Sequence, residues 1–177
     1  MTQQRLYLLG LRGSGKSTLG RRLALALQCP FVDLDDVTTR VLKQATAADA
    51  LRLLGEPAFR DGEAAALRDA SVLSAGVVAL GGGTPTGKRS AQLLADQQLA
   101  GARLIYLRAE ASTLRARLAA TNLATRPSLT GADPLIEIEV VLARRDPLYL
   151  EIADEVVQVD GMSEDAALAK LIEIARA

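Results

Sequence analysis

The sequence predicts an α/β fold built on a parallel sheet, and three observations support this prediction. Short apolar stretches alternate with helical stretches along the 177 residues, a pattern typical of strands joined by crossover helices. A glycine-rich segment separates the first apolar stretch from the first helical one. No repeat, low-complexity tract or linker interrupts the pattern, so we expect one domain over residues 1–177.

Short apolar runs between turn signals predict the strands, and apolar periodicity predicts the helices. Strands are expected at residues 5–10, 31–33, 77–80, 103–107 and 155–159. Helices are expected at residues 16–27, from 34 to 73 with a break near Gly55 and Pro57, after a cap at Ser112, at 136–145, and after a cap at Ser163. In the first of these helices, leucines recur at a spacing of four and define a buried face.

The composition is that of an ordinary globular protein, and it argues against several functions. Apolar residues make up 49% of the chain and aromatic residues 3%, so the core is expected to consist mainly of Leu, Val, Ile and Ala. Twenty-one basic residues balance 21 acidic ones, which argues against a nucleic-acid or membrane-binding surface. The absence of histidine removes Ser-His-Asp and Cys-His catalysis and, with a single cysteine, argues against zinc.

The lone cysteine, Cys29, fits a reducing compartment. No apolar run has the length of a signal sequence or a membrane span. A cytoplasmic location is therefore expected.

Residues 10–17, Gly-Leu-Arg-Gly-Ser-Gly-Lys-Ser, match the pattern G-x-x-x-x-G-K-[ST] in full. Its glycines let backbone N–H groups converge on phosphate oxygens at the start of a helix. Lys16 supplies a positive charge for the β- and γ-phosphates, and Ser17 supplies a hydroxyl ligand for Mg²⁺. Average residue usage puts a chance match below about 1%, so we expect ATP to bind here. The nucleotide-binding residues are predicted to be Gly13, Ser14, Gly15, Lys16, Ser17 and Thr18.

Five further segments, in order along the chain, are similar to motifs of the shikimate kinase family. They are Phe31-Val32-Asp33-Leu34-Asp35, Gly55-Glu56 with Phe59-Arg60 and Glu63, Gly81-Gly82-Gly83, Arg126-Pro127, and Arg145-Asp146-Pro147-Leu148-Tyr149. Each is weak alone, but the set at suitable intervals is specific. The resemblance implies a five-stranded parallel sheet flanked by helices, of the nucleoside monophosphate kinase-like P-loop type. It also implies a substrate-binding helical region at about 34–62 and a lid at about 119–135.

The family resemblance implies a monomer that uses ATP and Mg²⁺ to phosphorylate the 3-hydroxyl of shikimate. Asp35 would orient that hydroxyl or accept its proton, and Asp33 would approach Mg²⁺ through water. The spacing of these two acids on a strand places them on one face, although helix capping or solvation would also explain them. Arg60 and Arg145 would clamp the substrate carboxylate, with Glu63 bracing Arg60; surface ion pairs are the alternative.

The remaining site residues also follow from the resemblance. The backbone of Gly81, Gly82 and Gly83 would approach the substrate, unless the triplet is only a flexible strand exit. Arg126 would reach the transferring phosphoryl group from the lid, completing a catalytic set with Lys16 and Asp35; a solvated loop cation is the alternative. Arg117 would stack on adenine, although Arg115 lies on the same expected helix.

Two other functions stay open from the sequence. The chain could be a related P-loop kinase for another polyol acid or a nucleotide, or a non-catalytic ligand sensor of the same fold. Two arginines suited to a carboxylate favour a small acid over a nucleobase. Retention of Lys16, Ser17, Asp33 and Asp35 favours catalysis over sensing.

Overall fold

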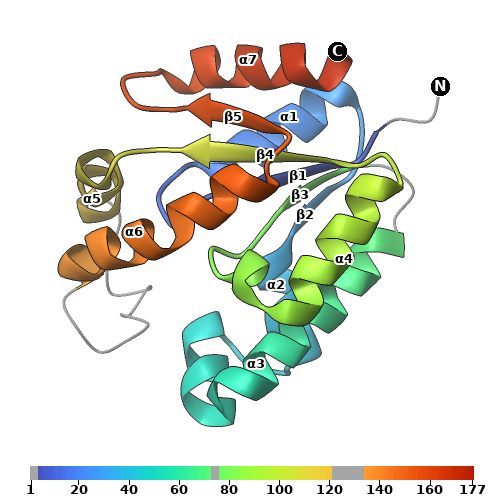
Figure 1. Ribbon diagram of the computed structural model, residues 1–177, viewed down its shortest axis with the longest axis vertical. Helices are drawn as coiled ribbons and strands as arrows, with labels where there is room; N and C mark the ends of the chain where they lie inside the picture. The colour runs from blue at the N-terminus through green and yellow to red at the C-terminus, as the bar shows by residue number, and fades with distance from the viewer. Residues whose placement is uncertain (1–3, 73–75, 121–133) are drawn as a thin grey trace.

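A five-stranded parallel sheet forms the centre of the computed structural model, which describes residues 4–72, 76–120 and 134–177 (Figure 1). The strands are β1 (Leu6–Leu9), β2 (Phe31–Asp33), β3 (Val77–Ala79), β4 (Arg103–Arg108) and β5 (Glu155–Gln158). Their order is β2-β3-β1-β4-β5, and every pairing is parallel. The predicted fold class and all the predicted strands are confirmed, with ends that shift by no more than one residue.

Burial on both faces explains why the central strands consist of continuous apolar runs. All residues of β1 and β3 are buried, as expected for a parallel sheet covered by helices. Leu6 of β1 lies opposite Val77 of β3 and Arg103 of β4. The strands therefore end together at one edge of the sheet, on the left of Figure 1, and the loops that follow them can build a common site there.

Helices cover the two faces of the sheet in separate groups (Figure 1). The helices are α1 (Lys16–Leu27), α2 (Leu34–Val41), α3 (Ala47–Val72), α4 (Lys88–Leu99), α5 (Ala111–Ala119), α6 (Pro134–Ile152) and α7 (Glu164–Arg176), with a 3₁₀ turn η1 (Thr84–Thr86). Helices α1 and α7 pack together on one face, and α3 and α4 pack together on the other. Helix α6 lies on the side of α4 and contacts β4.

Helix α3 is broken at Gly55, where the sequence predicts an interruption. Gly55 has φ 79° and ψ 165°, a conformation that glycine adopts without the strain of a Cβ. Pro57 follows within the first turn of the second half, where its missing N–H breaks no helical hydrogen bond. The break changes the direction of the chain within α3, and α3 as a whole packs against α2.

Three local predictions require correction. Helix α4 was not predicted, because it follows a Thr-Pro-Thr-Gly turn and exposes many polar residues. Helix α5 begins after Glu110, so Ser112 lies inside the helix and is not its cap. Helix α6 continues through Pro147 to Ile152, seven residues beyond its expected end at residue 145. The cap at Ser163 is confirmed, because its side chain accepts a hydrogen bond from the Ala166 N–H at 3.2 Å.

The core consists mainly of Leu, Val, Ile and Ala, as predicted, with three tyrosines added. Tyr7, Tyr106 and Tyr149 are at most 1% exposed. The rings of Tyr106 and Tyr149 meet edge to face at 5.1 Å and so join β4 to α6. Within the part of the chain that the structure describes, no helix combines the length and apolar character needed to span a membrane.

Candidate functional site

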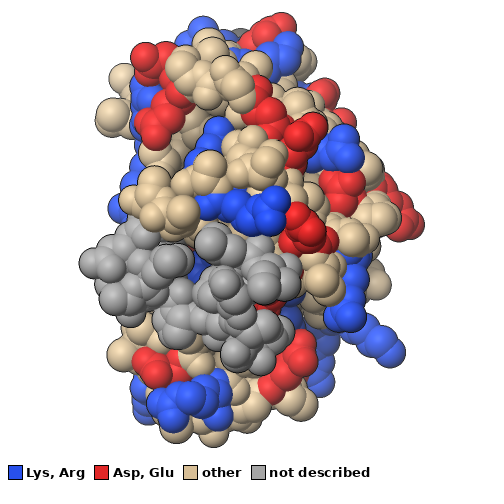
Figure 2. All heavy atoms as spheres, turned by 90° about the vertical axis from the view of Figure 1, so that its left-hand side faces the viewer, with Lys and Arg blue, Asp and Glu red and all other residues tan. Residues whose placement is uncertain are grey.

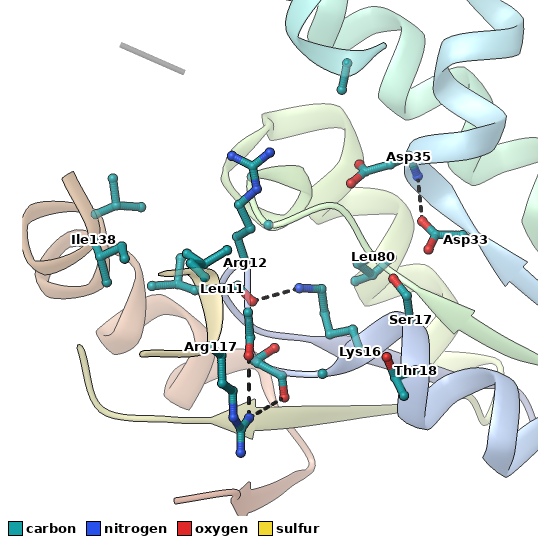
Figure 3. Close-up of a pocket in the computed structure, with 18 of the residues that line it drawn as sticks. Leu11, Arg12, Lys16, Ser17, Thr18, Asp33, Asp35, Leu80, Arg117 and Ile138 are labelled. Carbon is teal, nitrogen blue, oxygen red and sulfur yellow. Dashed lines mark hydrogen bonds between the residues drawn. The ribbon is translucent and has the colours of Figure 1, made fainter. Parts of the chain in front are cut away.

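A crevice of about 810 Å³ opens at the carboxyl ends of the strands (Figure 3). Its walls come from the β1–α1 loop, the ends of β2 and β3, and helices α2, α3, α5, α6 and α7. Figure 2 looks onto this end of the molecule, where basic and acidic side chains are intermixed on the surface. The lining residues include most of the predicted site: Gly13, Ser14, Gly15, Lys16, Ser17, Thr18, Asp33, Asp35, Arg60, Gly82, Gly83, Arg117 and Arg145.

The loop between β1 and α1 has the tight curvature that phosphate binding requires. Gly10, Gly13 and Gly15 have φ values of +146°, +85° and +97°, in the region that disfavours other residues. A Cβ on Gly10 would lie 2.7 Å from the carbonyl oxygen of Leu107 on β4. Gly15 is the N-cap of α1 and makes no side-chain cap hydrogen bond. The backbone N–H groups of the first turn are therefore oriented to receive an anion.

Lys16 lies across the centre of this loop. Its Nζ donates hydrogen bonds to the carbonyl oxygens of Gly10 and Leu11, both at 2.9 Å. These bonds hold the ammonium group inside the concave side of the loop (Figure 3), where it can meet phosphate oxygens. Ser14 is fully buried in the same loop.

Asp33 and Asp35 reach the crevice by a different route from the one predicted. Strand β2 ends at Asp33, and Asp35 already belongs to the first turn of α2, so the two residues do not share a strand face. Asp33 is instead the N-cap of α2, and its Oδ1 accepts a hydrogen bond from the Asp35 N–H at 3.2 Å. The capping alternative thus describes Asp33 correctly, but both carboxylates still lie around the same space as Lys16 and Ser17 (Figure 3).

The surroundings of Asp35 favour its protonated form. Burial of the carboxylate is the main cause that raises the pKa of Asp35 from 3.8 to about 6, and the negative charges of Asp33, Glu63 and Asp36 act in the same direction. The positive charge of Lys16 opposes them. A carboxylate with this pKa is well matched to accepting a proton near neutral pH.

Arg60 is held rigidly at the wall of the crevice by two acids on its own helix. Its guanidinium donates to Glu63 Oε2 at 2.5 Å and to Glu56 Oε1 at 3.3 Å. Glu63 is 1% exposed, and its Oε1 accepts a hydrogen bond from Thr84 Oγ1 at 2.9 Å. A buried carboxylate with both oxygens engaged cannot swing away, so Arg60 is presented to the crevice in one orientation.

Arg145 faces the same space from α6. Its Nη1 donates to the carbonyl oxygen of Gly82 at 2.7 Å, and the Tyr149 hydroxyl donates to that same oxygen. Arg144, the neighbouring alternative, is exposed and does not line the crevice. The structure therefore brings Arg145, and not Arg144, to the crevice wall beside Gly82.

The glycine triplet after β3 leaves room for these charged groups. A Cβ on Gly81 would lie 2.6 Å from Asp35 Oδ1 and 3.0 Å from Glu63 Oε1. A Cβ on Gly83 would lie 2.6 Å from Arg60 Nη1. Gly82 and Gly83 line the crevice, whereas Gly81 is not among its lining residues. The triplet thus works chiefly by leaving space for side chains from other elements.

Arg117 joins the phosphate-binding loop to the segment after β5. Its Nη2 donates to the carbonyl oxygen of Val159 at 3.0 Å, and its Nη1 approaches the carbonyl oxygen of Ser14 at 3.4 Å. Arg115 points elsewhere and pairs with Glu139 of α6 at 3.0 Å. Arg126 and most of the predicted lid lie outside the described residues.

Sequence reasoning missed several residues of the crevice. Arg12 occupies an unconstrained position of the loop motif, yet its side chain projects into the crevice (Figure 3). Thr84 and Tyr149 contact site groups at sequence separations of 21 and 67 residues. Tyr149 belongs to the Arg145–Tyr149 family motif, but no role was predicted for it. The signal for Thr84 is only its position directly after the glycine triplet.

The fold and the crevice together define a P-loop kinase of the nucleoside monophosphate kinase-like type. The phosphate-binding loop follows the first strand of a β2-β3-β1-β4-β5 sheet, and an aspartate and two anchored arginines share its crevice.

Comparison with known proteins identifies the family. A family model described as shikimate kinase matches residues 12–176. The shikimate kinase of Rhodopirellula baltica is 38% identical over 174 residues, covering 97% of this chain and 90% of the relative. The shikimate kinase of Oleidesulfovibrio alaskensis is 41% identical over 170 residues, covering 94% and 93%. The chain belongs to the shikimate kinase family.

Solved structures agree with this assignment. The structure of shikimate kinase from Acinetobacter baumannii in complex with shikimate superposes with a TM-score of 0.85 at 27% identity, covering 98% of this chain and 93% of that one. Shikimate kinase from Bacteroides thetaiotaomicron gives a TM-score of 0.84 at 25% identity, covering 98% and 99%.

Proposed function

We propose that this protein transfers the γ-phosphate of ATP to the 3-hydroxyl of shikimate, giving shikimate 3-phosphate and ADP. The observation that carries the proposal is the position of Asp35. It shares one crevice with Lys16 on the nucleotide side and with Arg60 and Arg145 on the substrate side. Family membership supports the choice of acceptor.

On the nucleotide side, we propose that backbone N–H groups of residues 13–18 bind the phosphates and that Lys16 follows the γ-phosphate during transfer. Arg117, anchored at Val159, would border the adenine. Arg126 of the predicted lid would neutralise the transferring group, as the family resemblance implies.

The residues beside Lys16 fit a magnesium ion. Ser17 and Asp33 both line the crevice and offer the oxygen ligands that Mg²⁺ prefers. No group of three or more His, Cys, Asp or Glu among the described residues could hold a metal by itself. Mg²⁺ at kinase sites needs only one or two protein ligands beside the substrate phosphates. Ser17 would bind it directly and Asp33 through water, and the ion would neutralise phosphate charge.

On the substrate side, Arg60 and Arg145 would hold the carboxylate of shikimate, since a planar guanidinium donates paired hydrogen bonds to it. Asp35 would accept the proton of the 3-hydroxyl as that oxygen bonds to the γ-phosphorus. The bond from phosphorus to the β–γ bridging oxygen breaks, and ADP leaves.

We also propose that the protein acts in the cytoplasm, in keeping with its single cysteine. We propose that it acts as a monomer, as the family resemblance implies.

ADP release by the purified protein with Mg·ATP tests the proposal directly. Parallel reactions contain shikimate, quinate, gluconate or no acceptor. We expect turnover with shikimate well above the other three. Equal or faster release with quinate or gluconate would favour a related small-acid kinase, and no acceptor-dependent release would favour a ligand sensor.

A further inference from the structure

An ion pair outside the predicted site ties the helix of Arg145 to the central sheet. Arg108, the last residue of β4, donates from Nε to Asp146 Oδ1 and from Nη2 to Asp146 Oδ2, both at 2.8 Å. The Tyr106 hydroxyl donates to the same Oδ1, also at 2.8 Å. Exposed ion pairs contribute little on average, but this pair is bidentate, and the Asp146 side chain is only 18% exposed.

Asp146 and Arg145 are neighbours that face different parts of the structure. Successive residues of an α-helix point about 100° apart, so Asp146 can bind β4 while Arg145 enters the crevice. Tyr149 lies one turn further along and contacts both systems. Its ring packs against Tyr106, and its hydroxyl donates to the Gly82 carbonyl that also accepts from Arg145.

These contacts form a connected network, here called the circuit, that joins β4, α6 and the loop after β3. Tyr106 is 1% exposed and pairs in the sheet with Leu9, the residue before the phosphate-binding loop. Hydrogen bonds from Arg108, as the first cause, lower the pKa of Asp146, so its carboxylate stays ionised at neutral pH. The circuit thus places α6 relative to the sheet that also carries the nucleotide site.

We propose that Asp146, through its hydrogen bonds with Arg108 and Tyr106, is a positioning residue that orients Arg145 to bind the substrate carboxylate. The inference rests on the proposed function, because it takes shikimate as the acid that Arg145 meets. Without these hydrogen bonds, α6 can rotate or slide on the sheet, and the Arg145 guanidinium loses its fixed orientation. Lys16, on the nucleotide side, is held by carbonyl oxygens of its own loop.

The test uses Asp146→Asn, which keeps the shape of the side chain and removes its charge, in the full-length protein. We expect the KM for shikimate to rise about tenfold, equivalent to about 1.4 kcal/mol. The KM for ATP and kcat should stay within about twofold of the wild type, because the lost interaction acts in substrate binding. Arg108→Gln should give the same pattern, and it provides a second reading should Asp146→Asn fold poorly.

Strand β4 offers a matched control at its other end. Arg103 pairs with Glu155 at 3.0 Å, also between β4 and a neighbouring element and also partly buried. It lies about 16 Å along the strand from Arg108. Arg103→Gln should leave the KM for both substrates within about twofold of the wild type.

A double variant decides whether Asp146 acts through Arg145. In the Arg145→Ala background, Asp146→Asn should change the KM for shikimate by less than about twofold, because the group that it positions is gone. Multiplied effects of the two substitutions would overturn the proposal. An unchanged KM for shikimate in Asp146→Asn, or a fall in kcat alone, would also overturn it. Failure of the wild type to use shikimate would instead refute the proposed function, so the two failures are distinguishable.

Discussion

The two halves of the crevice are built in different ways. The phosphate-binding part of the proposed nucleotide half comes from one continuous segment, residues 10–18, and presents mainly backbone groups and the Lys16 ammonium. The other half, which we propose binds the acid substrate and call the acid half, is assembled from α2, α3, the loop after β3, and α6. It presents side chains. A continuous loop carries its geometry in its own sequence, whereas the dispersed half depends on how distant elements pack. Substitutions in the two halves should therefore affect different kinetic constants.

The largest effect is expected in the nucleotide half. Lys16→Ala removes the ammonium that the loop holds at its centre, and kcat should fall by about 10³-fold or more, because the charge acts on the transferring phosphoryl group. The measurement is ADP release at saturating shikimate. Lys170→Ala, which changes an exposed lysine paired with Glu173 on α7, is the control and should be unaffected. Residual activity near the wild-type level would contradict the role of Lys16.

Asp35→Asn should separate chemistry from binding where the two halves meet. We expect kcat to fall by about 10²–10⁴-fold, because Asn cannot accept the hydroxyl proton. ATP binding, measured by calorimetry, should be nearly unchanged. Asp36→Asn alters the neighbouring acid, which is directed at Arg21 at 4.0 Å, and should have little effect. Equal losses in the two variants would remove the catalytic role from Asp35.

The same substitution should stabilise the fold, and the sign follows from the pKa. The folded protein binds the Asp35 proton more tightly than the unfolded chain does, since folding raises the pKa from 3.8 to about 6. The ionised carboxylate therefore destabilises the folded protein above pH 6, and Asn removes that penalty. Chemical denaturation should show a higher free energy of unfolding for Asp35→Asn at neutral pH. The gain should shrink as pH falls and vanish below about pH 4.

The pH profile of the wild-type protein tests the role of Asp35 without a substitution, and a smaller effect is expected. With the Asp35 pKa raised to about 6, kcat/KM for shikimate should rise with pH through that value and then level off. Below it, protonated Asp35 cannot accept the hydroxyl proton. A profile that is flat from about pH 5 to about pH 7 would contradict the assigned base. Initial rates of ADP release across buffers of equal ionic strength provide the measurement.

The smallest expected effect lies in the acid half. Gly83→Ala places a Cβ 2.6 Å from Arg60 Nη1, so the guanidinium must shift, and the KM for shikimate should rise about tenfold or less. Gly87→Ala is a matched control nearby, because its Cβ would meet no atom closer than 3.6 Å. Neither residue needs a positive φ, so the comparison isolates the steric contact. Equal KM values in the two variants would show that Arg60 is not positioned by this contact.

The contrast between the halves also explains what the sequence could predict. The phosphate-binding loop and α1 were predicted with correct bounds, because a continuous motif and leucine spacing determine both locally. The residues around the substrate side were named from family motifs, and the Arg60–Glu63 pair was expected and is present. Partners at larger sequence separations were not named. The contact between Thr84 and Glu63 spans 21 residues, and the one between Arg108 and Asp146 spans 38. Single-sequence periodicity carries no information about such pairs.

Apart from the missed helix α4, the wrong predictions each concerned the boundary of an element. Asp35 was placed on a strand, but Asp33 caps α2 and so ends the strand two residues earlier. A helix was expected to end at residue 145, yet α6 continues through Pro147 to Ile152, and Asp146 and Tyr149 beside that proline are anchored to β4 and to Gly82. A local cap therefore decided the first boundary, whereas tertiary contacts accompany the continuation of α6.

The most direct test of the two-part crevice is the steady-state kinetics of Arg145→Ala. Arg145 donates a hydrogen bond to Gly82 of the glycine triplet after β3 and faces the acid half. Its loss should therefore raise the KM for shikimate by about 30-fold or more. The KM for ATP should stay near that of the wild type. A variant whose ATP constant rises while the shikimate constant is unchanged would place this guanidinium at the nucleotide and contradict the division of the crevice.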